Sequence, residues 1–456
     1  MLESNFRMTS ASLVRSLHWQ RLWLIALALV LAVAALALGA SGSRRGWMLA
    51  VLVPTAFAPV AYARLRLFAR GAAPLRGRPA LIWTAAGLAV AADALMVAQL
   101  LTARAGDGVA LLQASGVQWV GPVWFSTHAL AALAYGARGL VRLAMRLLRW
   151  VTTAMRASGT PPDPAEGSLG RRAVLQQLGM FGAAAPFAVS LSGVPLSYDF
   201  RVDEHQVELP HWPPALDGLR IAHLSDIHVG GAMDRARLQH VAALTAAARP
   251  DLIVHTGDFL THRRGDFDAP LYEALATLRP RYGQFACFGN HDFDDPERLA
   301  RRLRAAGVTV LRDALTTLAI DGRSLEIAGL DFGFDRAQRA ADAARRIARW
   351  PARGAVPRLL LLHDPSEFAL LPDGCADLVL SGHTHGGHIG VQLGPERAIT
   401  VVGLAGIPDQ GVFRRGDMRL FVTRCVGFYG YPMRVGIPPE IAIVTVRAPR
   451  PASQPV

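Results

Sequence analysis

The chain has 456 residues, which is enough for two or three domains of ordinary size. Hydrophobic residues make up 52% of it and charged residues 18%, so the composition indicates a membrane-embedded part and excludes disorder over most of the length. Every basic residue is Arg and none is Lys, which excludes a lysine nucleophile or Schiff base. Residues 1–200 carry 18 Arg against 6 acids, whereas residues 201–456 carry 30 Arg against 29 acids. A nearly neutral second part argues against nucleic-acid binding.

Residues 1–150 are predicted to form an all-α bundle of four transmembrane helices. Stretches with at most one charge, each long enough for the roughly 30 Å hydrocarbon core, are residues 22–40, 46–63, 80–103 and 119–137. The N-terminal segment, the second loop and the segment after the fourth span together contain 13 Arg. The first and third loops together contain 3. The positive-inside rule therefore places both ends of this region in the cytoplasm of a bacterial cell. A transporter or sensor that uses Asp93 and His128 within the spans is an alternative, although pairing of these two side chains inside the bundle is the preferred interpretation.

Residues 151–200 are predicted to be a cytoplasmic linker followed by a fifth membrane segment. Arg171 and Arg172 precede 26 uncharged residues, 173–198. Together with Leu175, the arginine pair resembles the core of a twin-arginine export signal, and its internal position would make it an anchor. A fifth crossing places the rest of the chain in the periplasm. The alternative, a segment that lies on the surface, leaves the rest in the cytoplasm.

Residues 201–456 show the α/β pattern of short apolar runs separated by helical stretches. Five predicted strands end in polar residues: 219–224, 252–255, 285–288, 359–362 and 378–380. Ligands of open α/β sheets bind at the carboxyl ends of the strands, so we expect these polar side chains to converge.

The converging side chains have the composition of a binuclear metal site. The seven candidate ligands are Asp226, His228, Asp258, Asn290, His363, His383 and His385. Seven ligands are too many for one ion and sufficient for two divalent ions if one carboxylate bridges them, and this mixture suits Mn, Zn or Fe. Two pairs, Asp226 with His228 and His383 with His385, are spaced by two, which would point both members the same way on an extended strand end.

The ordered motifs resemble those of the calcineurin-like metallophosphoesterase superfamily. They are Asp226-x-His228, Gly257-Asp258, Gly289-Asn290-His291-Asp292, His363 and Gly382-His383-Thr384-His385. The following Gly386-Gly387 and the later Pro432-Met433-Arg434 resemble a bacterial branch of membrane-associated or exported phosphoesterases. The resemblance covers about residues 205–447 and implies two mixed sheets packed face to face with helices outside.

The resemblance also implies roles for individual residues. One ion is expected at Asp226, His228, Asp258 and His385, and the other at Asp258, Asn290, His363 and His383, so that Asp258 bridges. His291 is expected to donate a proton to the leaving oxygen, with Asp292 orienting its ring. Arg434 is expected to contact a phosphate, with a surface ion pair as the alternative. His388 stands where the pattern has Gln; it either contacts substrate, supports the site from outside the ligand shell, or lies in a solvated loop.

The expected function is hydrolysis of a phosphodiester or pyrophosphate bond by a hydroxide that bridges the two metals. A lipid-linked substrate is favoured because the membrane spans would hold the site near the bilayer. One alternative is a cytosol-facing pyrophosphatase that cleaves a nucleotide-linked acylated glucosamine in lipid A synthesis. Another is a non-catalytic scaffold, which is disfavoured because His291 and all seven ligands are present. Cys287, Cys375 and Cys425 form no CxxC pair, and one disulfide is left open.

Overall fold

The computed structural model describes residues 188–449, apart from 231–232, 262–267, 336, 395–396 and 428–432, together with Val123, Thr127 and Met145. The four predicted spans, apart from Val123 and Thr127 in the fourth, lie outside this description, as do residues 173–187 of the predicted fifth segment. Among the residues that are described, no helix combines the length and apolar character needed to cross a bilayer. A helix of residues 188–196 leads into the compact unit that begins at Ser192.

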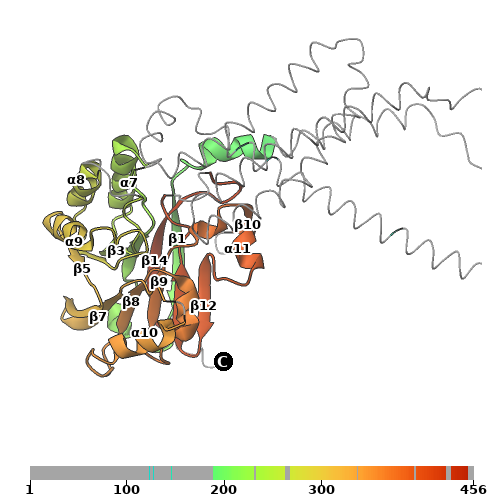
Figure 1. The fold of residues 1–456 in the computed structure, drawn as a ribbon. Helices are drawn as coiled ribbons and strands as arrows, with labels where there is room; N and C mark the ends of the chain where they lie inside the picture. Colours follow the sequence, from blue (N-terminus) through green and yellow to red (C-terminus); the bar gives the residue numbers. More distant parts are fainter. Residues whose placement is uncertain are drawn as a thin grey trace, which may run out of the picture. The chain divides into compact units, whose positions relative to one another are not determined.

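Two six-stranded sheets make up this unit in the described residues (Figure 1). The first sheet has the order β1 (Arg201–Glu208), β14 (Glu440–Arg447), β2 (Arg220–Leu224), β3 (Leu252–His255), β4 (Gln284–Ala286), β5 (Val308–Val310). The second has the order β12 (Gly411–Arg415), β13 (Met418–Val422), β9 (Leu378–Ser381), β8 (Arg358–Leu362), β7 (Arg323–Leu330), β6 (Ala314–Ile320). Both sheets are mixed, since β14 runs antiparallel to β2 and β12 antiparallel to β13.

The two sheets pack face to face, as the family resemblance implied. A shared core contains Leu252 and Val254 of β3 together with Leu359 and Leu361 of β8, while the intervening Ile253 points to a separate core. Side chains of a strand alternate between its two faces, so a strand that is buried on both sides reads as a continuous apolar run. This is why the sequence pattern located these strands.

Helices cover the outer faces of both sheets. The first sheet is covered by α7 (Arg235–Ala247), α8 (Ala269–Thr277) and α9 (Pro296–Ala305). The second is covered by α10 (Arg339–Ile347) and the 3-10 helix η3 (Pro365–Leu370). Helices α7 and α9 begin where Asp234 and Asp295 accept hydrogen bonds from backbone N–H groups of the first turn.

The remaining elements are short. They are the 3-10 helices η2 (Pro214–Leu216) and η4 (His385–Gly387), the hairpin of β10 (Gly390–Gly394) and β11 (Arg397–Thr400), and α11 (Val401–Leu404). The hairpin and α11 lie beside each other at one side of the unit, away from α8 and α9 (Figure 1).

The five predicted strands correspond to β2, β3, β4, β8 and β9, with ends that differ by at most two residues. In the first sheet β2, β3 and β4 are parallel, and in the second β8 and β9 are parallel. The expectation that all five strands deliver their side chains to one site is therefore met by two sheets rather than one. The disulfide left open by the sequence is not formed, because all three cysteines are free and buried.

Candidate metal centre

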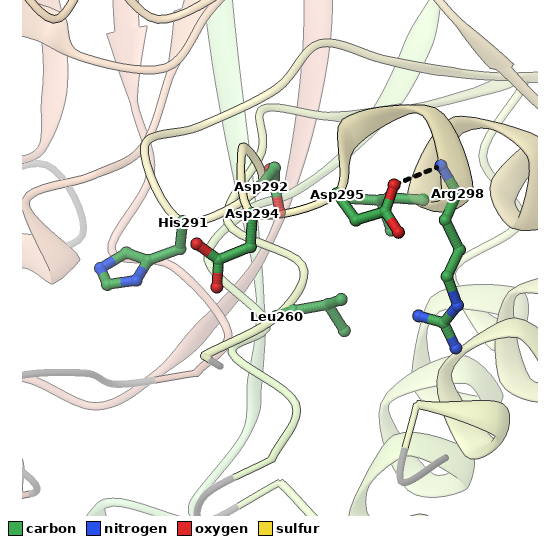
Figure 2. A pocket seen from close by; sticks show the side chains of 7 residues that line it. Leu260, His291, Asp292, Asp294, Asp295 and Arg298 are labelled. Carbon is green, nitrogen blue, oxygen red and sulfur yellow. Dashed lines mark hydrogen bonds between the residues drawn. The ribbon is translucent and has the colours of Figure 1, made fainter. Parts of the chain in front are cut away.

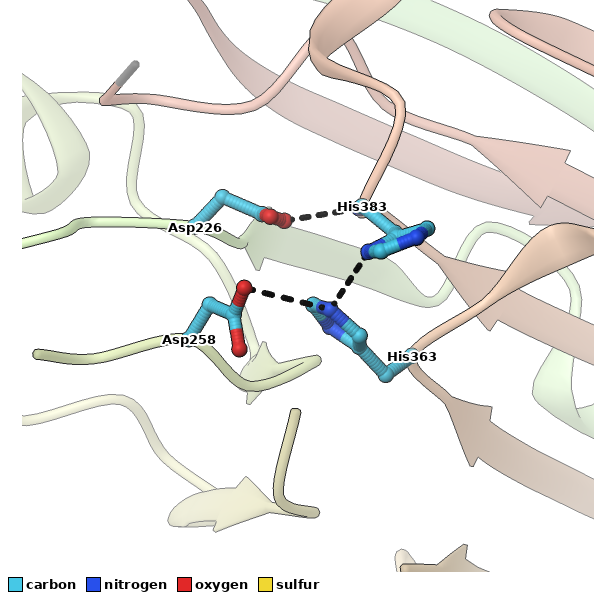
Figure 3. A group of neighbouring side chains, drawn as sticks. All are labelled: Asp226, Asp258, His363 and His383. Atoms are coloured by element: carbon cyan, nitrogen blue, oxygen red, sulfur yellow. Dashed lines mark hydrogen bonds and ion pairs between the residues drawn. The ribbon is translucent and has the colours of Figure 1, made fainter. Parts of the chain in front are cut away.

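The seven candidate ligands come together between the two sheets. Asp226 and His228 follow β2, Asp258 follows β3, and Asn290 follows β4. His363 follows β8, and His383 and His385 follow β9. Figure 3 shows Asp226 and Asp258 facing His363 and His383 across the gap between the sheets.

The first group of ligands comprises Asp226, His228 and His385, whose ligand atoms lie within 4.8 Å of one another. Oδ1 of Asp226 is 3.3 Å from Nε2 of His385 and 3.7 Å from Nε2 of His228, and the two rings are stacked with centroids 5.2 Å apart. Nδ1 of His385 donates to the carbonyl of Gly427 at 3.1 Å. In the neutral ring, Nε2 of His385 therefore turns a lone pair towards Asp226.

The second group comprises Asp226, Asp258, His363 and His383. Nε2 of His363 lies 3.3 Å from Oδ2 of Asp258, 3.1 Å from Oδ1 of Asn290 and 3.0 Å from Nδ1 of His383. Nδ1 of His363 donates to the carbonyl of Thr256 at 2.7 Å. Nε2 of His363 thus faces a carboxylate oxygen, an amide oxygen and an imidazole nitrogen, a set of lone pairs that a proton or a metal ion at the centre satisfies.

Electrostatics favour the same conclusion. Burial lowers the pKa of His363, but the charges of Asp258 and Asp226 outweigh it and raise that pKa to about 10. Oδ1 of Asp226 is buried and accepts no hydrogen bond. Such a concentration of negative charge in a dry site is stabilised by positive charge, and carboxylate with imidazole is a donor set that divalent Mn, Zn or Fe accepts. The residues present therefore fit two metal ions.

Two carboxylates lie between the groups. Oδ2 of Asp258 is 3.5 Å from Nε2 of His228 and 3.3 Å from Nε2 of His363, so it faces a member of each group. Asp226 also belongs to both groups. The bridging role assigned to Asp258 stays a prediction, and Asp226 is placed to share it.

The backbone of the ligands differs from the extended conformation that the two-residue spacing suggested. Asp226, His228, Asp258, His383 and His385 all have φ between 51° and 67°, the left-handed region. Residues other than Gly rarely adopt it, and such strain gathers at functional sites where the surroundings enforce it. The paired ligands therefore converge through tight loops that leave the strands, and not along straight strand ends.

Glycines let these loops approach the carboxylates. A Cβ at Gly289 would lie 2.6 Å from Cε1 of His363 and would overlap the Asp258 carboxylate. A Cβ at Gly382 would overlap Ser225 and Asp226. At both positions only Gly permits the close approach of loop and ligand.

Three groups that the sequence analysis did not identify hold Asp226. Its Oδ2 accepts hydrogen bonds from Oγ of Ser225 at 2.5 Å, from N of His383 at 2.8 Å and from Sγ of Cys425 at 3.1 Å. The position of Ser225 next to Asp226 is a signal that the sequence contained. Cys425 carried no signal, since it is 199 residues away.

The hydrogen bonds behind Ser225 continue into the first sheet. Oγ1 of Thr256 donates to Oγ of Ser225 at 2.7 Å, and Nε2 of His223 lies 2.9 Å from Thr256 Oγ1. Because the single hydroxyl proton of Thr256 is used on Ser225, Nε2 of His223 must be the donor. Burial lowers the pKa of His223 to about 3, so its ring is neutral. Every donor in the chain from His223 to Asp226 thus points towards the carboxylate.

The expected role of Asp292 in orienting the ring of His291 stays a prediction, and the structure shows other partners of its carboxylate. Its carboxylate accepts three backbone N–H groups, from Asp258 at 2.7 Å, Phe259 at 2.9 Å and Gly289 at 2.9 Å. Burial, followed by the charge of Asp258, raises the pKa of Asp292 to about 8, while these N–H groups oppose the shift. The side chain fastens the loop after β3 to the loop after β4, because buried N–H groups need an acceptor.

His291 lies at the rim of the ligand cluster. Its backbone N donates to Oδ1 of Asp258 at 2.8 Å, and its ring meets that of His228 edge-on, with centroids 5.1 Å apart. The residue is half-buried. It lines a small pocket together with Leu260, Asp292, Asp294, Asp295, Arg298 and Leu299, and its ring turns away from Arg298 (Figure 2). This placement is compatible with the predicted proton donor, which stays a prediction.

Arg434 is placed differently from both interpretations of the sequence. Its side chain is fully buried, and its guanidinium donates to backbone carbonyls of His385, Arg424, Cys425 and Gly427 at 2.5–3.0 Å. A guanidinium committed to four carbonyls in the interior is neither a surface ion pair nor positioned for a phosphate. Arg434 instead supports the loops that carry His385 and Cys425.

His388 lies against a candidate ligand, which is compatible with support of the site from outside the ligand shell. Its ring stacks on that of His385 with centroids 4.6 Å apart, and its φ is 56°. It therefore continues the stack of His228 and His385 outward. The expected roles of His388 stay predictions.

Two sheets that bring the seven candidate ligands to a shared, strained and buried site define a metal-dependent hydrolase of phosphoric esters. A family model described as calcineurin-like phosphoesterase matches residues 219–387. The chain is 30% identical to an uncharacterized metallophosphoesterase, YkuE, of Bacillus subtilis, over 59% of this chain and 96% of that protein. The chain belongs to the calcineurin-like phosphoesterase family and is a metal-dependent phosphoester hydrolase.

Two further relatives match a similar part of this chain. A transmembrane protein with metallophosphoesterase domain of Danio rerio is 29% identical over 54% of this chain and 57% of that protein. A UDP-2,3-diacylglucosamine pyrophosphatase, LpxG, of Chlamydia muridarum is 26% identical over 50% of this chain and 84% of that protein. The shared part in both is about half of this chain.

Proposed function

We propose that this protein is a membrane-anchored phosphoesterase with two divalent metal ions that hydrolyses a phosphodiester or pyrophosphate bond of a lipid-linked substrate. The observation that carries the reaction is the pair of ligand groups that share Asp226, with Asp258 between them. Membrane anchoring is supported by the long uncharged stretches within residues 1–150 and by the transmembrane relative. The lipid-linked substrate is supported by the relative that acts on an acylated glucosamine nucleotide.

The residues of the proposed site have three different roles. The ions supply Lewis acidity and a water of lowered pKa when they are bound. Asp226, His228 and His385 would hold one of them, and Asp258, Asn290, His363 and His383 the other. His291, half-buried at the rim, would hold a proton for the oxygen that leaves phosphorus. Asp292, Ser225 and Arg434 fix the loops so that the ligands keep their places.

The reaction is tested with the full chain purified in detergent. After exhaustive chelation we expect no hydrolysis of a chromogenic aryl phosphodiester, and recovery when Mn²⁺ is added. Activity that survives chelation would refute the two-metal proposal. A protein that binds metal and hydrolyses no phosphoester would support the scaffold alternative.

The proposed substrate class is tested by a comparison of head groups. A pyrophosphate that carries two acyl chains, dispersed in mixed micelles, should be hydrolysed with higher kcat/KM than the same head group without acyl chains. Equal values for the two compounds would contradict a lipid-linked substrate.

The proposed side of the membrane is the periplasm, with the domain carried across by residues 173–198. An alkaline phosphatase reporter fused after residue 205 should be active and one fused near residue 160 silent. Silence at both positions, with the catalytic domain protected from protease added to spheroplasts, would favour the cytosol-facing pyrophosphatase.

A further inference from the structure

Six large apolar side chains are exposed in one short stretch after the last metal ligands. They are Val391, Leu393, Ile399, Val401, Leu404 and Ile407, with exposed fractions from 40% to 79%. We call them the apolar hairpin patch. In the rest of the described residues from 192 onward, only Phe334 and Leu370 are large, apolar and exposed. Single exposed apolar residues are ordinary, but a cluster of this kind marks an interaction surface.

The patch is held in shape by its own backbone. β10 and β11 pair antiparallel with Val391 opposite Ile399, so that these two side chains share a face. α11 follows β11 directly, and its first turn is capped by Oγ1 of Thr400, which accepts from N of Gly403 at 2.9 Å. The exposure therefore belongs to folded elements and not to a frayed loop.

The base of the hairpin adjoins the metal centre. N of Val435 donates to the carbonyl of His388 at 2.8 Å, and N of Gly390 donates to the carbonyl of Val435 at 3.0 Å. His388 in turn stacks on the candidate ligand His385. The patch thus starts three residues after a side chain that touches the candidate ligand set.

The chain also enters the domain at this place. N of Arg434 donates to Oγ of Ser197 at 2.8 Å, and a Cβ on Gly193 would lie 2.6 Å from the carbonyl of Arg434. Residues 193–197 end the uncharged stretch 173–198. Residues 433–436 therefore contact the base of the hairpin on one side and the end of the uncharged stretch on the other.

We propose that the apolar hairpin patch rests in the surface of the lipid bilayer and brings the rim of the metal centre to it. The proposal depends on the membrane anchoring proposed above, since a bilayer that holds the uncharged stretch would also meet the adjacent hairpin. The sequence of residues 389–408 carries only two charges, Glu396 and Arg397. Immersion of the patch would therefore desolvate few charges, and a long Arg side chain can reach the head groups.

A second copy of the chain is a weaker candidate for the occupant. Stable protein interfaces usually use about 20–30 residues on each side, far more than the six of this patch. A lipid surface imposes no such minimum, because every apolar side chain that enters it contributes separately.

Contact with lipid is tested by a fluorophore in full-length protein reconstituted into vesicles of phosphatidylcholine and phosphatidylglycerol. The three native cysteines are buried, so Leu404→Cys can be labelled selectively with an environment-sensitive dye. The matched control is Asp417→Cys, an exposed position in the turn between β12 and β13. We expect nitroxide-bearing lipids to quench the label at 404 and to leave the label at 417 unchanged.

Two outcomes would overturn the proposal. In one, the label at 404 reports water and is quenched no more than the control. In the other, it reports an apolar environment without lipid quenching and loses that signal when the protein is diluted in lipid, which would indicate a second copy.

A second measurement separates this proposal from the proposed function. The double variant Val401→Asp, Leu404→Asp should lose turnover of an acylated pyrophosphate in vesicles several-fold and keep its turnover of the soluble aryl phosphodiester. Unchanged turnover of both would contradict the role of the patch. If native protein hydrolyses no acylated substrate while the label at 404 is quenched, the substrate assignment fails and the docking surface stands.

Discussion

The Asp226 carboxylate depends on hydrogen-bond donors that are not themselves candidate metal-ligand atoms. Ser225, Cys425 and the backbone of His383 all donate to Oδ2, which leaves Oδ1 directed at His228 and His385. Donors that hold a ligand reduce the cost of arranging it when metal binds. At the scale of single residues, the sequence therefore named the ligands but not the groups that aim them.

Ser225→Ala removes one of these donors. We expect Mn²⁺ affinity to fall by roughly 10–100-fold, the usual effect of losing a partner of a ligand. Metal titration monitored by calorimetry measures it. Thr245→Ala is the control, because it removes a buried hydroxyl on α7 that bonds only its own helix, at Val241. An equally large loss of Mn²⁺ affinity in Thr245→Ala would show that the loss does not depend on the hydrogen bond to Asp226.

His291→Ala tests the proton donor. Metal content should stay near normal, because the backbone N–H that bonds Asp258 remains, whereas turnover should fall by roughly 10²–10⁴-fold on a substrate with a poor leaving group. Metal analysis and kcat for two leaving groups check both parts. The assignment is wrong if the variant loses its metals or keeps full turnover, and His211→Ala serves as an exposed histidine control.

At the scale of elements, buried charges join strands that are distant in the sequence. Glu440 at the start of β14 accepts from His205 of β1 at 2.6 Å and from N of Arg424 at 2.8 Å. Burial raises the pKa of Glu440, but His205 and then Arg424 outweigh it and lower the pKa to about 2. Neither partner could be read from the sequence, because β1 and β14 become neighbours only in the folded sheet.

The sign of the pH dependence follows from that lowered pKa. A carboxylate with a depressed folded pKa stabilises the fold above its unfolded pKa and loses this contribution as the pH falls. From 4.5 to about 2, the shift corresponds to roughly 3 kcal/mol. Glu440→Gln should therefore lower the unfolding temperature at pH 7, and the difference from the native protein should narrow between about pH 4.5 and pH 2. A difference that is constant across this range would exclude the mechanism.

Arg434 connects the loop after β13 to η4, and its loss should weaken these elements together. Arg434→Lys keeps the charge but cannot donate to four carbonyls at once. We expect a lower unfolding temperature and lower metal content, because each buried carbonyl left without a donor costs about 1–3 kcal/mol. A phosphate contact would instead raise KM with metal content and stability unchanged, so the two measurements distinguish the roles.

At the scale of the whole molecule, the candidate metal centre takes its ligands from both sheets. Asp258 and Asn290 come from the first sheet, and His363 and His383 from the second. A ligand that binds only the assembled site stabilises the whole fold, by about 2.7 kcal/mol when its concentration is 100 times Kd.

Metal should therefore raise the unfolding temperature of the catalytic domain. Thermal unfolding followed by intrinsic fluorescence, with chelator and with Mn²⁺, measures the shift. Asp258→Asn should reduce the shift strongly, and the surface variant His211→Ala should retain it. An equal shift in Asp258→Asn would place the stabilising metal elsewhere.

The sequence by itself identified the candidate ligands and determined the strands that carry them. This was possible because strands buried on both faces are continuous apolar runs, and because β2, β3, β4, β8 and β9 each end directly before a polar motif. Strands such as β6 and β10, which are exposed on one face, gave no comparable signal. A short local pattern was sufficient to predict a strand and its candidate ligand wherever the two are adjacent in the sequence.

Only the tertiary structure decided what surrounds those ligands. It showed that Asp292 fastens two loops, that Arg434 is buried beneath the site, and that the ligand backbones are left-handed. These properties depend on contacts between residues tens to hundreds of positions apart, such as Cys425 with Asp226. A hydrogen bond between distant segments produces no periodic pattern in the sequence of either segment. Its two partners can therefore be identified only in the folded structure.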